Sequence, residues 1–198
     1  GGRPSIASPA CPLTRCGYRH CNLEHILQHC CGGSGLVGGS RSTRHNALFP
    51  PLLGFIGRHA SNWHYVGEPE HDPPDFLVPP DWKHRVRTLT PEHLRPATKP
   101  DLILASALST ERAWVRIVDF QVSWDTRCEA SAERKVDKYR PLAAIITDSM
   151  LAAGCRDPDV QVVPIIIGAR GAIPSGWSRA IQTLKLQGTP HHQLAARL

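Results

Sequence analysis

The sequence predicts a mixed α/β domain in which helices cover a β-sheet. Two apolar segments, 101–106 and 113–123, flank the turn-forming stretch Ser109-Thr110-Glu111 and therefore indicate a β-hairpin. A helical segment follows the hairpin, and a third apolar run, 160–167, follows that helix. Strands that alternate with helices in this way are typical of a sheet packed between helices.

Before the hairpin, one helix, one short strand and a loop are expected. The helix extends from Thr43 to about Arg58 with leucines on one side, and Pro50 and Pro51 would kink or delay it. A short strand at 63–66 and a proline-rich loop at 69–100 follow. The basic residues of this loop suit either contact with phosphates or simple solvation: Lys83, Arg85, Arg87, Arg95 and Lys99.

After the hairpin, a second long helix is expected. Thr126 and Glu129 have the spacing of a capping box, and the helix would run to about Ala153, bend at Pro141 and stop at Gly154. Pro164 interrupts the third strand and has no N–H to donate, which predicts an edge position or a bulge. A last helix is expected at 175–186.

Length and charge suit one domain with a small appended module. The chain has 198 residues, a formal net charge of +6 and a pI near 9.1. That charge suits a polyanionic partner without identifying one. No apolar run approaches about 18 residues, and no charged-then-apolar leader is present, so we expect neither a membrane span nor a signal peptide.

A pair of carboxylates is the main candidate for chemistry. If the hairpin is symmetric about Thr110, Asp101 lies directly opposite Asp119, and two bare carboxylates at that spacing would repel. Mg²⁺ or Mn²⁺ would remove the repulsion. Lys135 and Lys138, three residues apart, share a helix face beside Tyr139 and can reach back over the sheet. A metal and a lysine suit phosphodiester hydrolysis, while a structural Asp–Lys pair is the alternative.

The cysteines cluster at the N-terminus. Five of the seven fall in the first 31 residues, and histidines lie among them, which favours a metal site over disulfides. Cys11, Cys16, His25 and Cys30 form a CCHC set suited to tetrahedral Zn²⁺. Other side chains could replace the first ligand: His20, Cys21, His29 or Cys31. The expected organisation is therefore a zinc module and Gly/Ser-rich connector, 1–42, followed by the main domain, 43–198.

Several short motifs carry a resemblance to a known family. KPD at 99–101, VDFQV at 118–122 and KVDKY at 135–139 resemble the restriction-like endonuclease domain of site-specific non-LTR retrotransposons. STRHN at 42–46, VVPIIIGARGAIP at 162–174 and the CCHC zinc knuckle are similar to the same family, so the resemblance covers roughly residues 11–186.

This resemblance implies a fold and a set of roles. The domain would have the PD-(D/E)xK restriction-endonuclease-like fold, a mixed sheet flanked by helices, with Asp101 and Asp119 as metal ligands. Gln121 stands where that fold usually carries its lysine. By resemblance to the retrotransposon branch, Lys135 takes that role, Lys138 is second, and Tyr139 contributes less directly.

The implied activity is Mg²⁺-dependent nicking of double-stranded target DNA in the nucleus. The nick would prime reverse transcription of element RNA by a polymerase elsewhere in the parent protein. Six residues would contact the nucleic acid: Arg44, His45, Lys83, Arg85, Arg87 and Lys99. Two alternatives stay open, a catalytically inert nucleic-acid-binding module and a structure-selective junction nuclease of the same fold.

Overall fold

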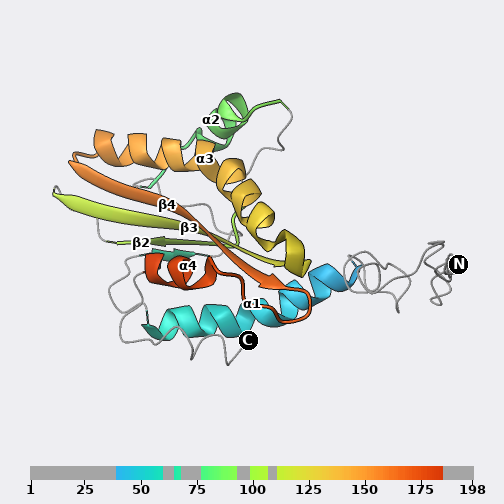
Figure 1. The fold of residues 1–198 in the computed structure, drawn as a ribbon. Coiled ribbons are helices and arrows are strands. Elements are labelled where there is room, and N and C mark those ends of the chain that lie inside the picture. Colours follow the sequence, from blue (N-terminus) through green and yellow to red (C-terminus); the bar gives the residue numbers. More distant parts are fainter. Residues whose placement is uncertain (1–38, 60–64, 68–76, 93–98, 107–110, 185–198) are drawn as a thin grey trace, which may run out of the picture.

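The computed structural model describes residues 39–59, 65–67, 77–92, 99–106 and 111–184 (Figure 1). The elements in chain order are α1 (Gly39–His59), β1 (Tyr65–Gly67), α2 (Trp82–Leu89), β2 (Leu102–Ala105), β3 (Arg112–Ser123), a 3₁₀ turn η2 (Asp125–Arg127), α3 (Cys128–Ala152), β4 (Asp157–Gly168) and α4 (Trp177–Thr183). The predicted mixed α/β class is confirmed. None of the helices in these ranges has the length and hydropathy of a membrane span.

The sheet is mixed, with the strand order β1-β2-β3-β4. β2 is antiparallel to both β1 and β3, whereas β4 is parallel to β3. Leu102 pairs with Val118 and Ala105 with Val115, which is the register expected for a hairpin symmetric about Thr110. Continued by one pair, this register places Asp101 opposite Asp119, as predicted.

The two faces of β3 belong to different layers of the core. Val118, Phe120 and Val122 pack with residues of α1 and α4, whereas Val115 and Ile117 pack with residues of α2 and α3. Figure 1 shows these helix pairs on opposite sides of the sheet. Because strand side chains alternate, the face toward α3 continues through three buried polar residues: Asp119, Gln121 and Ser123. On the face of β3 toward α3, the buried side chains therefore change from apolar to polar in the direction of the C-terminal end of the strand.

Two proline predictions are confirmed. Pro164 lies in β4, the edge strand of the described sheet. An edge strand accommodates a residue that has no N–H without losing a hydrogen bond to a neighbouring strand. Pro141 lies inside α3, which changes direction along its length in Figure 1. Gly154, with φ of +90°, follows the end of α3, a conformation that glycine adopts without steric cost.

Three other expectations need correction. Thr126 lies inside η2, so the capping box does not form, and α3 begins at Cys128 without a side-chain cap. The 69–100 segment is not only loop, because it contains α2; Trp82 and Val86, four residues apart, bury one face of that helix against α3. The first helix is continuous through Pro50 and Pro51 and begins at Gly39, ahead of the expected start.

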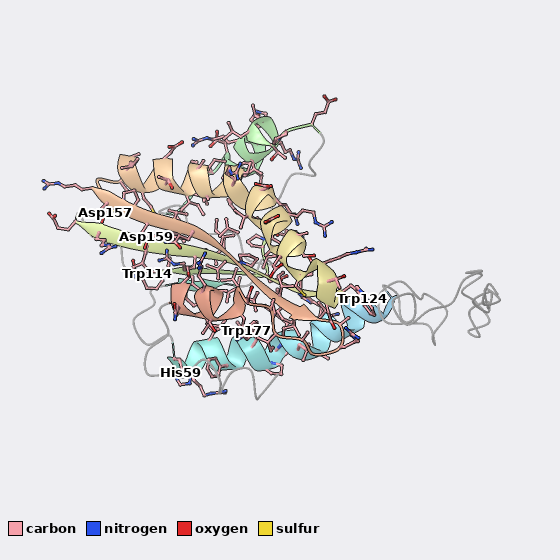
Figure 2. All side chains as sticks on the ribbon, viewed as in Figure 1. His59, Trp114, Trp124, Asp157, Asp159 and Trp177 are labelled. Atoms are coloured by element: carbon pink, nitrogen blue, oxygen red, sulfur yellow. The ribbon has the colours of Figure 1, made fainter. Side chains whose placement is uncertain are left out.

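A buried arginine ties the sheet to α4. The Arg116 side chain is 1 % exposed, and its guanidinium donates to Asp159 Oδ2 at 2.7 Å, the Asp159 carbonyl at 2.7 Å, the Thr183 carbonyl at 2.8 Å and the Val115 carbonyl at 2.9 Å. The Trp114 ring lies 5.4 Å from the guanidinium carbon. In Figure 2, Trp114, Asp157 and Asp159 lie at the same end of the β3–β4 pair. This network joins β3, β4 and the end of α4.

Candidate functional site

The predicted carboxylates and lysines meet at one pocket of about 440 Å³. Its walls come from α1, the segment before β2, strand β3 and helix α3. The lining residues are His45, Asn46, Lys99, Asp101, Asp119, Phe120, Gln121, Val122, Lys135 and Lys138. The antiparallel register of β2 and β3 places the two aspartates side by side at the pocket. Helix α3 packs on the same face of the sheet and places Lys135 and Lys138 at the pocket.

Asp119 is held inside the pocket by two donors from α3. The residue is only 3 % exposed, so its ionised carboxylate must be compensated. Lys135 forms an ion pair with Oδ1, and the Tyr139 hydroxyl lies 2.6 Å from Oδ2. Oδ1 contacts the ammonium without the alignment of a hydrogen bond, so among the described residues it lacks an oriented donor. One oxygen of Asp119 therefore retains capacity for a further ligand.

Tyr139 acts as a hydrogen-bond donor and stays protonated. Its hydroxyl lies 2.6 Å from Asp119 Oδ2 and 2.7 Å from the Lys99 carbonyl, and its single proton serves one of them at a time. Lys138 Nζ approaches the same hydroxyl at 3.3 Å. Burial and the Asp119 carboxylate raise the pKa of Tyr139 far above its ordinary value. Tyr139 therefore cannot serve as a base near neutral pH.

Asp101 is the more open of the two carboxylates. Its Oδ2 accepts a 2.6 Å hydrogen bond from the Phe120 backbone N–H and lies 3.2 Å from His45 Nε2. The side chain is 24 % exposed. The hydrogen bond to Asp101 raises the pKa of His45 above 6.5, although partial burial opposes that shift. The pairing with Asp101 thus favours the protonated, positively charged form of His45.

In the metal-free protein, we expect the pKa of His45 to lie above 6.5 and to be lower in Asp101→Asn. A raised pKa means that the folded state binds the His45 proton more tightly than the unfolded state does, so protonation of His45 stabilises the fold. This contribution to stability is complete below pH about 6.5 and is lost as the pH rises through the pKa of His45 in the folded protein. An NMR titration of the His45 ring protons in EDTA measures both values. An unchanged pKa in the variant would contradict the pairing.

The two aspartates fit a hard divalent cation. Mg²⁺ usually takes one or two carboxylates and fills its other positions with water and phosphate oxygens. Asp101 and Asp119 supply two carboxylates on one pocket wall. The described residues contain no group of three or more His, Cys, Asp and Glu side chains that could hold a metal. Two carboxylates would leave the other coordination positions of Mg²⁺ or Mn²⁺ to water or other oxygen ligands.

The predicted zinc ligands Cys11, Cys16, His25 and Cys30 lie outside the described residues, as do their alternatives. Cys128 and Cys155 are buried free thiols. Burial raises the pKa of the Cys128 thiol, which keeps it protonated and unreactive.

The predicted nucleic-acid contacts divide into two places. His45 and Lys99 line the pocket, whereas Lys83, Arg85 and Arg87 lie on α2, outside the pocket lining. Arg85 pairs with Asp148 of α3 at 3.2 Å. Arg44 lies in α1, where only the backbone is described. The predicted site residues omitted four that line the pocket, although all four fall inside the quoted motifs STRHN and VDFQV: Asn46, Phe120, Gln121 and Val122.

A larger cavity of about 600 Å³ lies between α3, β4 and α4. Its acidic side chains, Glu129, Glu133 and Asp137, recur every four residues on one face of α3. Such a stripe is usually a solvated helix face. The smaller pocket brings both carboxylates and both lysines together from separate elements, and we therefore place the functional site there.

The chain matches no protein-family model and no curated protein. The pocket and the sequence motifs are therefore the features of this chain that bear on its function.

Proposed function

We propose that this chain is a metal-dependent DNA endonuclease of the PD-(D/E)xK type. The observation that carries the proposal is the convergence of Asp101, Asp119 and Lys135 on one pocket, with Asp101 directly before β2 and Asp119 on the adjacent strand β3. The motif resemblance to the nuclease domain of site-specific non-LTR retrotransposons supports the same assignment.

In this proposal Asp101 and Asp119 would hold Mg²⁺ or Mn²⁺, which would polarise the phosphoryl group and favour ionisation of water. Lys135 compensates Asp119 and offsets negative charge that develops on the phosphate. Tyr139, which stays protonated, orients Asp119 by donating to its other oxygen, Oδ2. Lys138, 3.3 Å from the Tyr139 hydroxyl, acts on the carboxylate through that tyrosine.

The biological role follows from the family resemblance. The nick would free a 3′ hydroxyl on the target DNA, from which a polymerase in the parent protein copies element RNA in the nucleus. A Zn²⁺ knuckle formed by the N-terminal Cys/His cluster would help to hold the nucleic acid. The formal net charge of +6 is compatible with such a polyanionic substrate.

Nicking of supercoiled plasmid tests the proposal directly. We expect the full chain to convert supercoiled to open-circular DNA in Mg²⁺ or Mn²⁺ and to be inactive in EDTA. The same protein should be assayed on linear and four-way-junction duplexes. Similar rates on linear and branched DNA support the target-nicking role, whereas cleavage confined to the junction assigns the chain to structure-selective nucleases.

A second candidate is an inert nucleic-acid-binding module. One observation favours it: Gln121 occupies the position where this nuclease fold usually has its lysine. Such a module would bind DNA with strong salt dependence and would not cut it in any divalent metal. Binding without nicking by the chain and by its full-length parent would establish this second role.

The two lysines should differ in their contribution. We expect Lys135→Met to lower the single-turnover nicking rate by about 10²-fold or more, because its ammonium contacts Asp119 directly. Lys138→Met should cost about 10-fold or less, since that ammonium acts through Tyr139. Single-turnover assays at saturating protein measure both. A larger loss in Lys138→Met would reverse the assigned roles.

A further inference from the structure

Gln121 is a buried polar side chain inside the pocket. It follows Asp119 by two residues on β3, so both side chains lie on the same face of the strand. The residue is 8 % exposed and lines the pocket. Within the described part of the chain, its carboxamide has no hydrogen-bond partner, whereas the Ser123 hydroxyl, next on the same face, lies 2.8 Å from that of Ser131.

The amide of Gln121 is not fully enclosed by protein, so its unpaired N–H groups are open to water or to a ligand that fills the pocket. Several donors in the pocket already serve its carboxylates. Lys135 and Tyr139 serve Asp119, while the Phe120 N–H serves Asp101. The carboxamide of Gln121 adds N–H donors that serve no protein acceptor among the described residues.

We propose that Gln121 contacts the scissile phosphate by donating an N–H hydrogen bond to a non-bridging oxygen. This inference rests on the proposed nuclease function and names one group that would hold its substrate. Phosphate oxygens are acceptors, so they match the donors of the amide, and the two carboxylates already offer the cation its anionic oxygens. Because a primary amide is neutral, the contact does not require a further buried charge beside Lys135.

Three substitutions distinguish a donor from a metal ligand. Gln121→Met keeps the length and removes the hydrogen bonds, and it should lower single-turnover nicking by about 10²-fold. Gln121→Lys restores a donor and should recover most of that rate. Gln121→Glu keeps oxygen atoms but repels phosphate, and it should be as slow as Gln121→Met or slower. Recovery by glutamate and not by lysine would overturn the inference, as would wild-type nicking by Gln121→Met.

A second readout does not depend on cleavage. The side-chain NH₂ resonances of Gln121, assigned by their absence from Gln121→Met, should shift when duplex DNA is added in Ca²⁺. Gln161 is the matched control because its amide donates to Asp159 at 2.7 Å, outside the pocket. Unmoved Gln121 resonances in DNA-bound protein would overturn the inference even if nicking occurs. Shifted resonances without nicking in Mg²⁺ or Mn²⁺ would support the phosphate contact and count against the nuclease.

Discussion

Asp101→Asn and Asp119→Asn are each expected to lower the nicking rate by at least about 10³-fold, since a bound cation contributes several kcal/mol of transition-state stabilisation. The amide is nearly isosteric with the carboxylate and keeps an oxygen acceptor, but it removes the negative charge that holds the cation. Affinity for duplex DNA should be unchanged or slightly higher, because one charge that repels phosphate is lost. Single-turnover nicking and equilibrium binding on the same samples measure the two effects.

Asp137→Asn is the matched control for this pair. Asp137 lies on α3 between Lys135 and Lys138, but it is exposed, pairs with Arg140 and lies outside the pocket. Its replacement should leave nicking at the wild-type rate. Asp119→Asn deprives the partly buried Lys135 ammonium of its carboxylate, so thermal unfolding should be checked in that variant. Wild-type nicking by folded Asp101→Asn would show that cleavage does not arise at this pocket.

The carboxylate pair could be predicted because two local rules determine it. A hairpin symmetric about its turn fixes which residues are opposite, and this placed Asp101 beside Asp119 without knowledge of the tertiary structure. The three-residue spacing of Lys135 and Lys138 places both on one face of a helix. Spacing alone did not decide which ammonium meets Asp119, since that depends on how α3 crosses the sheet.

Other features depend on contacts that leave little trace in the sequence. The short helix α2 has only Trp82 and Val86 on its buried face and follows Pro79 and Pro80, so the proline-rich composition concealed it. Its burial against α3 stabilises it, which is a tertiary effect. In the same way, the sequence shows Gln121 only as a departure from a motif, and only the structure shows that it lines a pocket together with charged side chains.

Arg116 is the clearest tertiary feature of this kind, because an arginine in a strand gives no sign that it is buried. Its guanidinium serves a carboxylate and three carbonyls, which link β3 to β4 and to the end of α4. A buried charge is tolerated only with such complete pairing. Removal of the arginine would leave Asp159 Oδ2 and the three carbonyls without the hydrogen bonds that the guanidinium donates.

We therefore expect Arg116→Met to lower the free energy of unfolding by about 3–5 kcal/mol, the usual cost of breaking a buried ion pair from one side. Arg112→Met is the control, because Arg112 lies four residues earlier in β3 and its pair with Asp157 is exposed on both sides, at 64 % and 69 %. That substitution should cost no more than about 0.5 kcal/mol. Urea denaturation followed by circular dichroism measures both variants. Equal losses would mean that the Arg116 network contributes no more than a surface pair, and the attachment of α4 to the sheet would then depend on the apolar contacts of Trp177 and Ile181.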